Sequence, residues 1–592
     1  MTSVTWTLAA MGARIAQGWR RAGDRLRARR LPTGPRPSAF VAWPEPRTIG
    51  SYTSGLQLLA GNFQFAGRLV EAPRTPIWEV ESPSPEFTAE MNGFAWLDDL
   101  IIAGDAKARR QARVWVNDWI RRYGKGQGPG WTPELTGRRV LHWIAHAVPL
   151  MRVMDEGQSD AFLWALGRQA GFLKHRWSSA PPGPARIAAL TGLVYCALAL
   201  EGRGGDLGPA LRALGREAAR EVGPDGGIAT RNPEELLTVF TLLTWASRTA
   251  QETGHQPDRR HLEALARIAP TLRALRLGDG ALTRFHGGGR GIEGQLDQTL
   301  ADAGIRSGRR DGLAMGYAQI AHGRTKIVVD AAAPPRGRAS ANGHASTLGF
   351  EMSSGRRPII VNCGPGYRFG PDWRRASRAT ASHSAPGLER VSSSGIAPEG
   401  FVGNTFGERL IRTPADVSYQ RANDLTGTWI RCTHDGYVDT HGLICERRLF
   451  LSSDGRSILG EDRFTAETPR QKARLDSRRS DKAVRFQCHF HVHPDVTAAL
   501  DLGGQAVSLK LRSEEVWILR QEGGTLSLDA SAYLDQTRLH PRATKQAVVS
   551  ADLLGYGGAV TWSLRRASDG SRATRDLHLD PEERRADPET DQ

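Results

Sequence analysis

The chain has 592 residues, enough for three to four domains of ordinary size, with 40% hydrophobic and 24% charged residues. These globular values exclude wholesale disorder, and no stretch approaches the roughly 18 continuous apolar residues of a transmembrane helix, so we expect none. The formal net charge of +16 favours an anionic partner, namely nucleic acid, an acidic membrane or an acidic polysaccharide, although a solvated basic surface also explains it.

Residues 1–45 form a basic lead-in that ends in a Pro-rich linker. This segment lacks the basic n-region and long apolar h-region of a secretory signal. Residues 13–30 show the pattern of a basic amphipathic helix, which either touches an acidic membrane surface or covers a neighbouring domain. Covering a neighbouring domain is the commoner role.

Residues 46–305 carry a helical pattern, because apolar residues recur at three- and four-residue steps. Gly- and Pro-rich connections separate the periodic segments. We therefore predict a domain of stacked helical hairpins, curved into a bundle or ring. The pattern is clearest in residues 94–121, 140–150, 190–197, 236–243 and 262–272.

Trp131 differs from the other tryptophans of this half because it follows a Gly-Pro-Gly loop and stands close to Glu134. A loop tryptophan beside a carboxylate suits stacking on a sugar ring. The same position suits packing at the start of a helix, so both interpretations stay open.

Residues 310–566 have a different texture, with short β-branched runs split by Gly, Asp and Ser. Without helical pattern between them, such runs predict antiparallel sheets packed as a sandwich. Residues 348–353 alternate strictly, which predicts a strand with one buried and one wet face. His344 precedes this strand, where an imidazole either reaches a ligand or is simply a loop residue. The polar tail, residues 567–592, is expected to fray.

Several short motifs, taken in order, resemble the heparinase II/III polysaccharide lyase family over most of the chain. Each is weak alone, but together they span a helical half and a β half. The resemblance implies an incomplete (α/α) toroid followed by an antiparallel β-sandwich, with the active cleft between them. The motifs lie at residues 61–63, 131–138, 225–233, 343–345, 375–384, 434–437, 460–462 and 490–494.

The chemistry implied by the resemblance is β-elimination on a uronic-acid polysaccharide. This reaction needs a group that neutralises the substrate carboxylate, a base for the adjacent proton and an acid for the leaving oxygen. Arg and His suit the first role, and Tyr or His the others. The resemblance implies His344, Tyr367 and His383 as catalytic residues. It implies a substrate-binding set of Arg231, Asn62, Trp131, Glu134, Arg375 and His434. No cofactor is required, although the resemblance leaves room for a structural divalent metal in the β-sandwich.

The chain departs from the family pattern on the toroid side. Active members carry an Asn-His pair where this chain has residues 184–187, and a Tyr-His pair where it has Glu235 and Leu236. A phenol with a pKa near 10 and a carboxyl with a pKa near 4 suit different proton transfers. Cys445 replaces a histidine, which weakens an inherited zinc site.

Three functions follow from these observations. The first is a lyase acting on an acidic polysaccharide. The second is a glycoside hydrolase that uses Glu134, Asp225, Glu234 or Glu235, although these acids also suit helix starts. The third is a non-catalytic binder of anionic glycan. Nucleic acid is not expected as a partner because the basic residues are spread and no recognition motif appears.

The compartment and the oligomeric state are left open by the sequence. The resemblance implies the cell envelope or periplasm, whereas the missing export signal allows the cytoplasm. Five cysteines without a CxxC pair suggest neither a disulfide framework nor a thiolate zinc site. Such sparse use fits a reducing compartment without excluding the periplasm.

Overall fold

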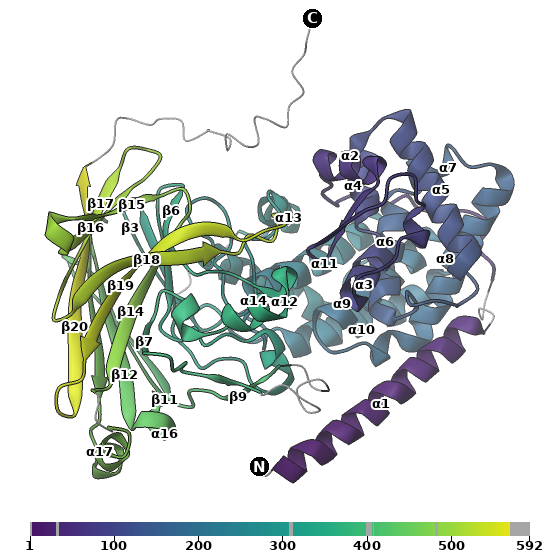
Figure 1. Ribbon diagram of the computed structural model, residues 1–592. Coiled ribbons are helices and arrows are strands. Elements are labelled where there is room, and N and C mark those ends of the chain that lie inside the picture. The colour runs from purple at the N-terminus through teal and green to yellow at the C-terminus, as the bar shows by residue number, and fades with distance from the viewer. Residues whose placement is uncertain are drawn as a thin grey trace, which may run out of the picture.

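The computed structural model describes residues 3–30, 35–306, 312–397, 405, 408–479 and 483–568, and places a helical half beside a β half (Figure 1). Most of the predicted tail, from residue 569 on, and the predicted boundary at residue 310 lie outside the described residues. Within the described ranges, every helix is too short or too polar to span a bilayer.

The helical half is built around α9, whose side chains from Ile187 to Ala199 are all buried. α6 packs on α9 through two glycines, since a Cβ on Gly192 would lie 2.7 Å from Gly137 Cα. The basic helix α1 lies along this half and contacts α8 (Figure 1). The helices are α1 (Ser3–Arg29), α2 (Tyr52–Ala60), α3 (Pro85–Gly93), α4 (Trp96–Ala103), α5 (Ala106–Tyr123), α6 (Pro133–Ala145), α7 (Ala147–Met151), α8 (Glu156–Arg176), α9 (Pro184–Ala199), α10 (Leu207–Glu221), α11 (Pro233–Glu252), α12 (Arg259–Ala274) and α13 (Gln295–Ala303).

The predicted helical stretch 94–121 is two helices rather than one. Gly104 ends α4 with φ of 74°, a left-handed conformation that glycine adopts without strain. Asp105 then caps α5 by accepting a hydrogen bond from the backbone N–H of Ala108. The hydrophobic period continues across this break, which is why the sequence pattern did not reveal it. A short hairpin of β1 (Asn62–Phe65) and β2 (Arg68–Glu71) precedes these helices.

The β half is a sandwich of two antiparallel sheets. The outer sheet has the order β10 (Val417–Asn423), β11 (Gly427–Tyr437), β12 (Leu443–Ser452), β13 (Ser457–Thr465), β20 (Gly557–Ser568), β17 (Val516–Glu522), β16 (Ala506–Lys510) and β15 (Thr497–Asp501). The inner sheet has the order β18 (Thr525–Tyr533), β19 (Arg542–Asp552), β14 (Arg485–Val492), β6 (Arg357–Val361), β5 (Phe350–Ser354), β4 (Thr325–Asp330) and β3 (Tyr317–His322), and β7 (Pro386–Leu388) pairs with β14.

Strand β5 of the inner sheet is buried on both faces, so the prediction of a wet face on it was wrong. On β4, Ile327 and Val329 join the sandwich core, while Val328 joins the core of the helical half. On β5, Glu351 and Ser353 are buried because the helical half covers them, and Ser353 Oγ accepts a hydrogen bond from the backbone of Gly278. The polar residues that suggested a solvated face belong to the contact between the halves.

Candidate active site between the two halves

Arg231, at the start of α11, joins the helical half to the inner sheet. Its Nε donates to Met315 O, Nη1 to Ala332 O and Ala333 O, and Nη2 to Gly316 O and Asp330 Oδ1, at 2.5–3.1 Å. A guanidinium has five N–H groups, and here all five have protein acceptors. Arg231 therefore has no donor left for a substrate carboxylate, and its predicted role as an anion holder is corrected to that of a buried strut.

A second buried strut lies near the first. Glu351 on β5 accepts hydrogen bonds from the backbone N–H groups of Arg284 and Asn362 and from Arg284 Nε, at 2.8–3.3 Å. Arg284 comes from the helical half, so the contact crosses the boundary. Paired, hydrogen-bonded charges of this kind fix the arrangement of two domains, because breaking one partner leaves the other charge buried.

His344 and His383 are in direct contact. His344 Nδ1 lies 3.0 Å from His383 Nε2, and His383 Nδ1 lies 2.8 Å from the carbonyl oxygen of Ala379. The backbone N–H of His344 donates to Nδ1 of His286, whose Nε2 lies 3.4 Å from Asp330 Oδ2. His344 is only 4% exposed. The structure thus brings two predicted catalytic residues together, but both are buried. His286, which belongs to the helical half, packs against the backbone of His344.

Burial keeps these imidazoles neutral. It holds the pKa of His344 well below its usual value, and the nearby His383 and Arg378 add to the effect. Burial lowers the pKa of His383 to about 3. Asp330, although burial alone would raise its pKa, has a lowered pKa because Arg231 and His286 favour the carboxylate. A base for carbon acids near neutral pH needs an accessible lone pair. Both ring nitrogens of His383 are bonded, whereas His344 uses only Nδ1, and its Nε2 has no hydrogen bond among the described residues.

The helical side of the boundary presents carboxylates. Asn232 caps α11 by accepting from the backbone N–H groups of Glu234 and Glu235. Glu234 Oε2 in turn accepts from the backbone N–H of Gly289 at 2.8 Å. Burial raises the pKa of Glu235, which bonds to Thr230 and Asn342 and feels the charges of Glu234 and Glu134.

Tyr367, in the short 3-10 helix Tyr367–Phe369, is 41% exposed beside these acids. Its pKa is raised by partial burial and by the carboxylates of Glu234 and Glu90, against the opposing effect of Arg368. Arg368 lies over the Tyr367 ring and 3.9 Å from Glu90 on α3. The sandwich and the helical half therefore share this polar patch, which we call the boundary patch: Tyr367, Arg368, Glu90, Glu134, Glu234 and Glu235.

Trp131 belongs to the core, so the sugar-stacking interpretation was wrong. The side chain is buried, its Nε1 donates to Tyr123 O at 2.8 Å, and its ring packs against Trp119 and Phe172. Arg139 lies over the same ring. The residue follows a loop in sequence but lies under it in space, since α6 begins immediately after it.

Of the remaining predicted binding residues, Glu134 belongs to the boundary patch, and no contact among the described residues joins the others to it. Asn62 is the first residue of β1 and donates to Gln57 Oε1 at 2.6 Å. Arg375 pairs with Glu408 at 2.8 Å. Glu134 pairs with Arg138 at 3.0 Å. His434 is buried on β11, where burial lowers its pKa to about 4. The side chain of His434 is therefore not accessible to a ligand in solvent.

Among the described residues, no group of three or more His, Cys, Asp or Glu side chains is arranged to hold a metal ion. Cys445, on β12, is buried in the sandwich core. The structural divalent metal thus finds no ready ligand set in the described β half.

Sequence reasoning missed the residues that complete this region. His286 sits in a Gly-rich loop whose only signal was the isolated histidine itself. Arg368 follows the predicted Tyr367 directly, and Asn342 lies two residues before His344. Their relevance depends on contacts across the boundary between the halves, which no local pattern encodes.

Comparison with known proteins adds the family. A family model described as "Heparinase II/III-like, C-terminal" matches residues 305–563. "FtsZ-localized protein C" of Caulobacter vibrioides is 31% identical over 546 residues, which cover 90% of this chain and 91% of that protein. The chain belongs to the heparinase II/III-like family.

Solved structures agree on the fold of this family member. Heparinase III matches with a TM-score of 0.65 at 11% identity, covering 95% of this chain and 93% of that one. The heparan sulfate lyase HepC of Pedobacter heparinus matches with a TM-score of 0.55 at 13% identity, covering 94% and 89%. The heparinase-like protein thus has the toroid-plus-sandwich architecture of polysaccharide lyases, as predicted.

Proposed function

We propose that this heparinase-like protein recognises a glycan at the boundary patch without performing β-elimination on it. The observation that carries the proposal is the contact between His344 and His383, which are buried and hydrogen-bonded to each other. Both ring nitrogens of His383 are therefore occupied, and His344 has its Nδ1 occupied and its pKa lowered by burial. Arg231, the expected anion holder, is likewise fully bonded.

The charges of the boundary patch support the same conclusion. Elimination from a uronic acid needs positive charge beside the substrate carboxylate. The patch sets one arginine, Arg368, which pairs with Glu90, against three further carboxylates. Glu134, Glu234 and Glu235 repel a second carboxylate and accept hydrogen bonds from sugar hydroxyls. A neutral or amino-sugar chain therefore fits this patch better than a uronate. The half-exposed ring of Tyr367 offers a surface on which such a sugar can lie.

Binding and turnover can be measured together. The protein would be mixed with a neutral N-acetylglucosamine oligosaccharide and with uronic-acid polymers, following affinity, ultraviolet absorbance of unsaturated products and new reducing ends. We expect the neutral oligosaccharide to bind without either product. Glu234→Gln and Tyr367→Phe should weaken that binding. Glu263→Gln, in an exposed pair on α12, is the matched control and should not.

Two outcomes would overturn the proposal in different directions. An unsaturated product that disappears in His344→Ala would establish a lyase. New reducing ends that disappear in Glu235→Gln would establish a hydrolase, for which the raised pKa of Glu235 beside Glu234 and Glu134 is the favourable feature. If none of the glycans in the panel bound, the glycan-recognition proposal would be wrong altogether.

A second candidate function comes from the relative. The Caulobacter protein is named for its localisation with FtsZ, and it matches this chain along nearly its whole length. We propose that this protein also localises with FtsZ. Fluorescent fusions of both proteins in the native cell should show coincident positions, and a signal spread evenly through the cell would contradict the proposal.

A further inference from the structure

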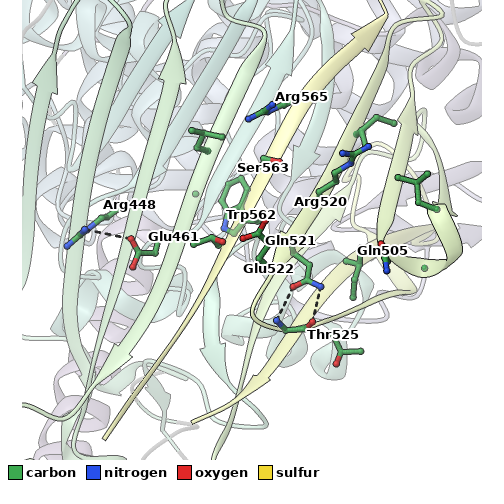
Figure 2. Close-up of a pocket in the computed structure, with 18 of the residues that line it drawn as sticks. Arg448, Glu461, Gln505, Arg520, Gln521, Glu522, Thr525, Trp562, Ser563 and Arg565 are labelled. Atoms are coloured by element: carbon green, nitrogen blue, oxygen red, sulfur yellow. Dashed lines mark hydrogen bonds and ion pairs between the residues drawn. The ribbon is translucent and has the colours of Figure 1, made fainter. Parts of the chain in front are cut away.

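The outer sheet has a large open groove on the face turned away from the helical half (Figure 2). The cavity measures about 1280 Å³, and its lining mixes charged, hydroxyl and amide side chains with apolar ones, mainly from β12, β13, β20 and β17 and the turn before β18. None of the residues assigned to the boundary patch lines it. Whatever this groove does is therefore separate from the site between the halves.

The strand register shows which side chains share this face. Trp429 on β11 is opposite Phe450 on β12, Phe450 is opposite Leu459 on β13, Leu459 is opposite Ser563 on β20, and Ser563 is opposite Arg520 on β17. Directly opposed residues point to the same side of a sheet. With strands about 4.8 Å apart, the row runs roughly 19 Å from Trp429 to Arg520. Trp429 is 41% exposed at one end of it.

Two arginines in the groove have no partner. Arg565 on β20 is opposite Ile518 on β17, so Arg565 and Arg520 are diagonal neighbours, about 7–8 Å apart at their backbones. Within the described part of the chain, neither guanidinium has an ion-pair or hydrogen-bond partner, and Figure 2 shows both beside Ser563. Arg448, in contrast, pairs with Glu446 at 2.6 Å and with Glu461 at 3.7 Å.

Two like charges held close together on rigid strands favour an anion between them. Each guanidinium presents a planar fork that fits a carboxylate, and the Ser563 hydroxyl between them supplies a further donor. The strands fix all three positions, so a ligand does not have to order mobile loops. This arrangement is the charge complement of an acidic group.

We propose that the groove binds a carboxylate-bearing polysaccharide, with Arg520, Arg565 and Ser563 holding a carboxylate and Trp429 carrying a sugar ring. A sugar chain suits the lining because Gln505, Thr525 and Thr561 offer amide and hydroxyl groups along it. An acidic peptide would meet the same arginines, but the exposed indole of Trp429 together with the hydroxyl and amide groups along the groove matches the apolar face and the hydroxyls of a sugar ring. This inference rests on the proposed function only in that both take a glycan as the partner. The acidic glycan binds the outer sheet here, away from the boundary patch.

The test is binding of polygalacturonate to the full chain, measured by affinity electrophoresis and calorimetry. Arg520→Gln/Arg565→Gln should raise the dissociation constant at least tenfold, and Trp429→Ala about threefold. Arg390→Gln/Arg485→Gln removes two exposed charges outside the groove and is the matched control, with an expected change below twofold. Thermal melting of each variant checks that the fold is kept.

The possible outcomes separate this inference from alternatives. An equal loss in the control pair would mean that net charge alone attracts the polymer, and would overturn the proposal. Polyglutamate bound as tightly as polygalacturonate would overturn it in favour of an acidic protein partner. Glu234→Gln should leave polygalacturonate binding unchanged while weakening the neutral oligosaccharide, so the two sites can fail independently.

Discussion

The boundary between the halves and the groove of the outer sheet use the same residue types in opposite ways. At the boundary, Arg231 and Arg284 are buried and each pairs with a buried carboxylate. In the groove, Arg520 and Arg565 are exposed and have no ion-pair partner in the part of the chain that the structure describes. Both regions belong to one β-sandwich, one on the inner sheet and one on the outer.

This difference shows which arginines still have N–H donors that can bind an anion. A guanidinium whose five donors are used holds the protein together, and only an unpaired guanidinium can add a ligand. The arginines that the sequence suggested for a substrate cleft form buried ion pairs at the boundary and hold the two halves together. The inference that acidic glycan binds the outer groove follows from that contrast.

The largest expected effect comes from breaking the boundary strut. Arg231→Ala leaves the carboxylate of Asp330 buried without its main partner, which should lower the free energy of unfolding by about 3–5 kcal/mol. Urea denaturation followed by circular dichroism would measure it. Arg259→Ala, which removes an exposed side chain paired with Glu263, should change it by less than about 0.5 kcal/mol. A similar small change for Arg231→Ala would disprove the strut.

Two tryptophans sharpen the comparison of buried and exposed positions. Trp131→Phe removes one of the two donors to Tyr123 O, which keeps the backbone N–H of Gly126, and the smaller ring loses core contacts, at an expected cost of about 1–2 kcal/mol in unfolding free energy. Trp429→Phe on the groove should cost less than about 0.5 kcal/mol. If Trp429→Phe destabilised the protein as much as Trp131→Phe, the groove would be a packed surface rather than an open one.

The buried imidazoles should make stability depend on pH. His383 has a folded pKa of about 3, below the ordinary 6.5, so only the unfolded chain takes up its proton between these values. Its stabilisation is therefore complete above pH 6.5 and is lost as the pH falls. Each unit below 6.5 should cost up to about 1.4 kcal/mol for this residue.

Denaturation midpoints at pH 7.5, 6.5 and 5.5 would show this dependence. His383→Gln should reduce the acid slope by that amount, whereas His255→Gln, at an exposed position, should not alter it. An unchanged slope in His383→Gln would contradict the lowered pKa of His383, because it would mean that the folded and unfolded chains take up this proton over the same pH range.

Patterns that are local in sequence predicted most of the architecture. The residues of α11 and α12 carry a helical period, and β4, β6 and β14 carry β-branched or alternating runs, so their type follows from side-chain spacing. The family motifs located the region of His344 and Tyr367. These features depend on neighbours a few residues away, which is the range that propensity and periodicity encode.

The wrong predictions concern residues whose burial and hydrogen bonds depend on segments far away in the sequence. Arg231 meets residues 315–316 and 330–333, and no spacing in the sequence announces that all five of its donors are used there. Trp131 looks like a loop residue because its burial comes from Phe172 on α8. The groove could not be foreseen, since Trp429 and Arg520 share a face only through the registers of β11, β12, β13, β20 and β17.

The smallest predicted effect concerns Glu522, a carboxylate on β17 that also lines the groove. It is two residues from Arg520 on the same face, about 7 Å along the strand. At that distance in water two unit charges interact by about 0.5 kcal/mol, so Glu522 should repel an acidic chain by this amount. Glu522→Gln should therefore tighten polygalacturonate binding roughly twofold, and raising the salt concentration should erase the gain. Calorimetry at low and high salt would measure it. A gain that persisted at high salt, or a loss of affinity, would show that Glu522 contacts the ligand by hydrogen bonding instead of opposing it by charge.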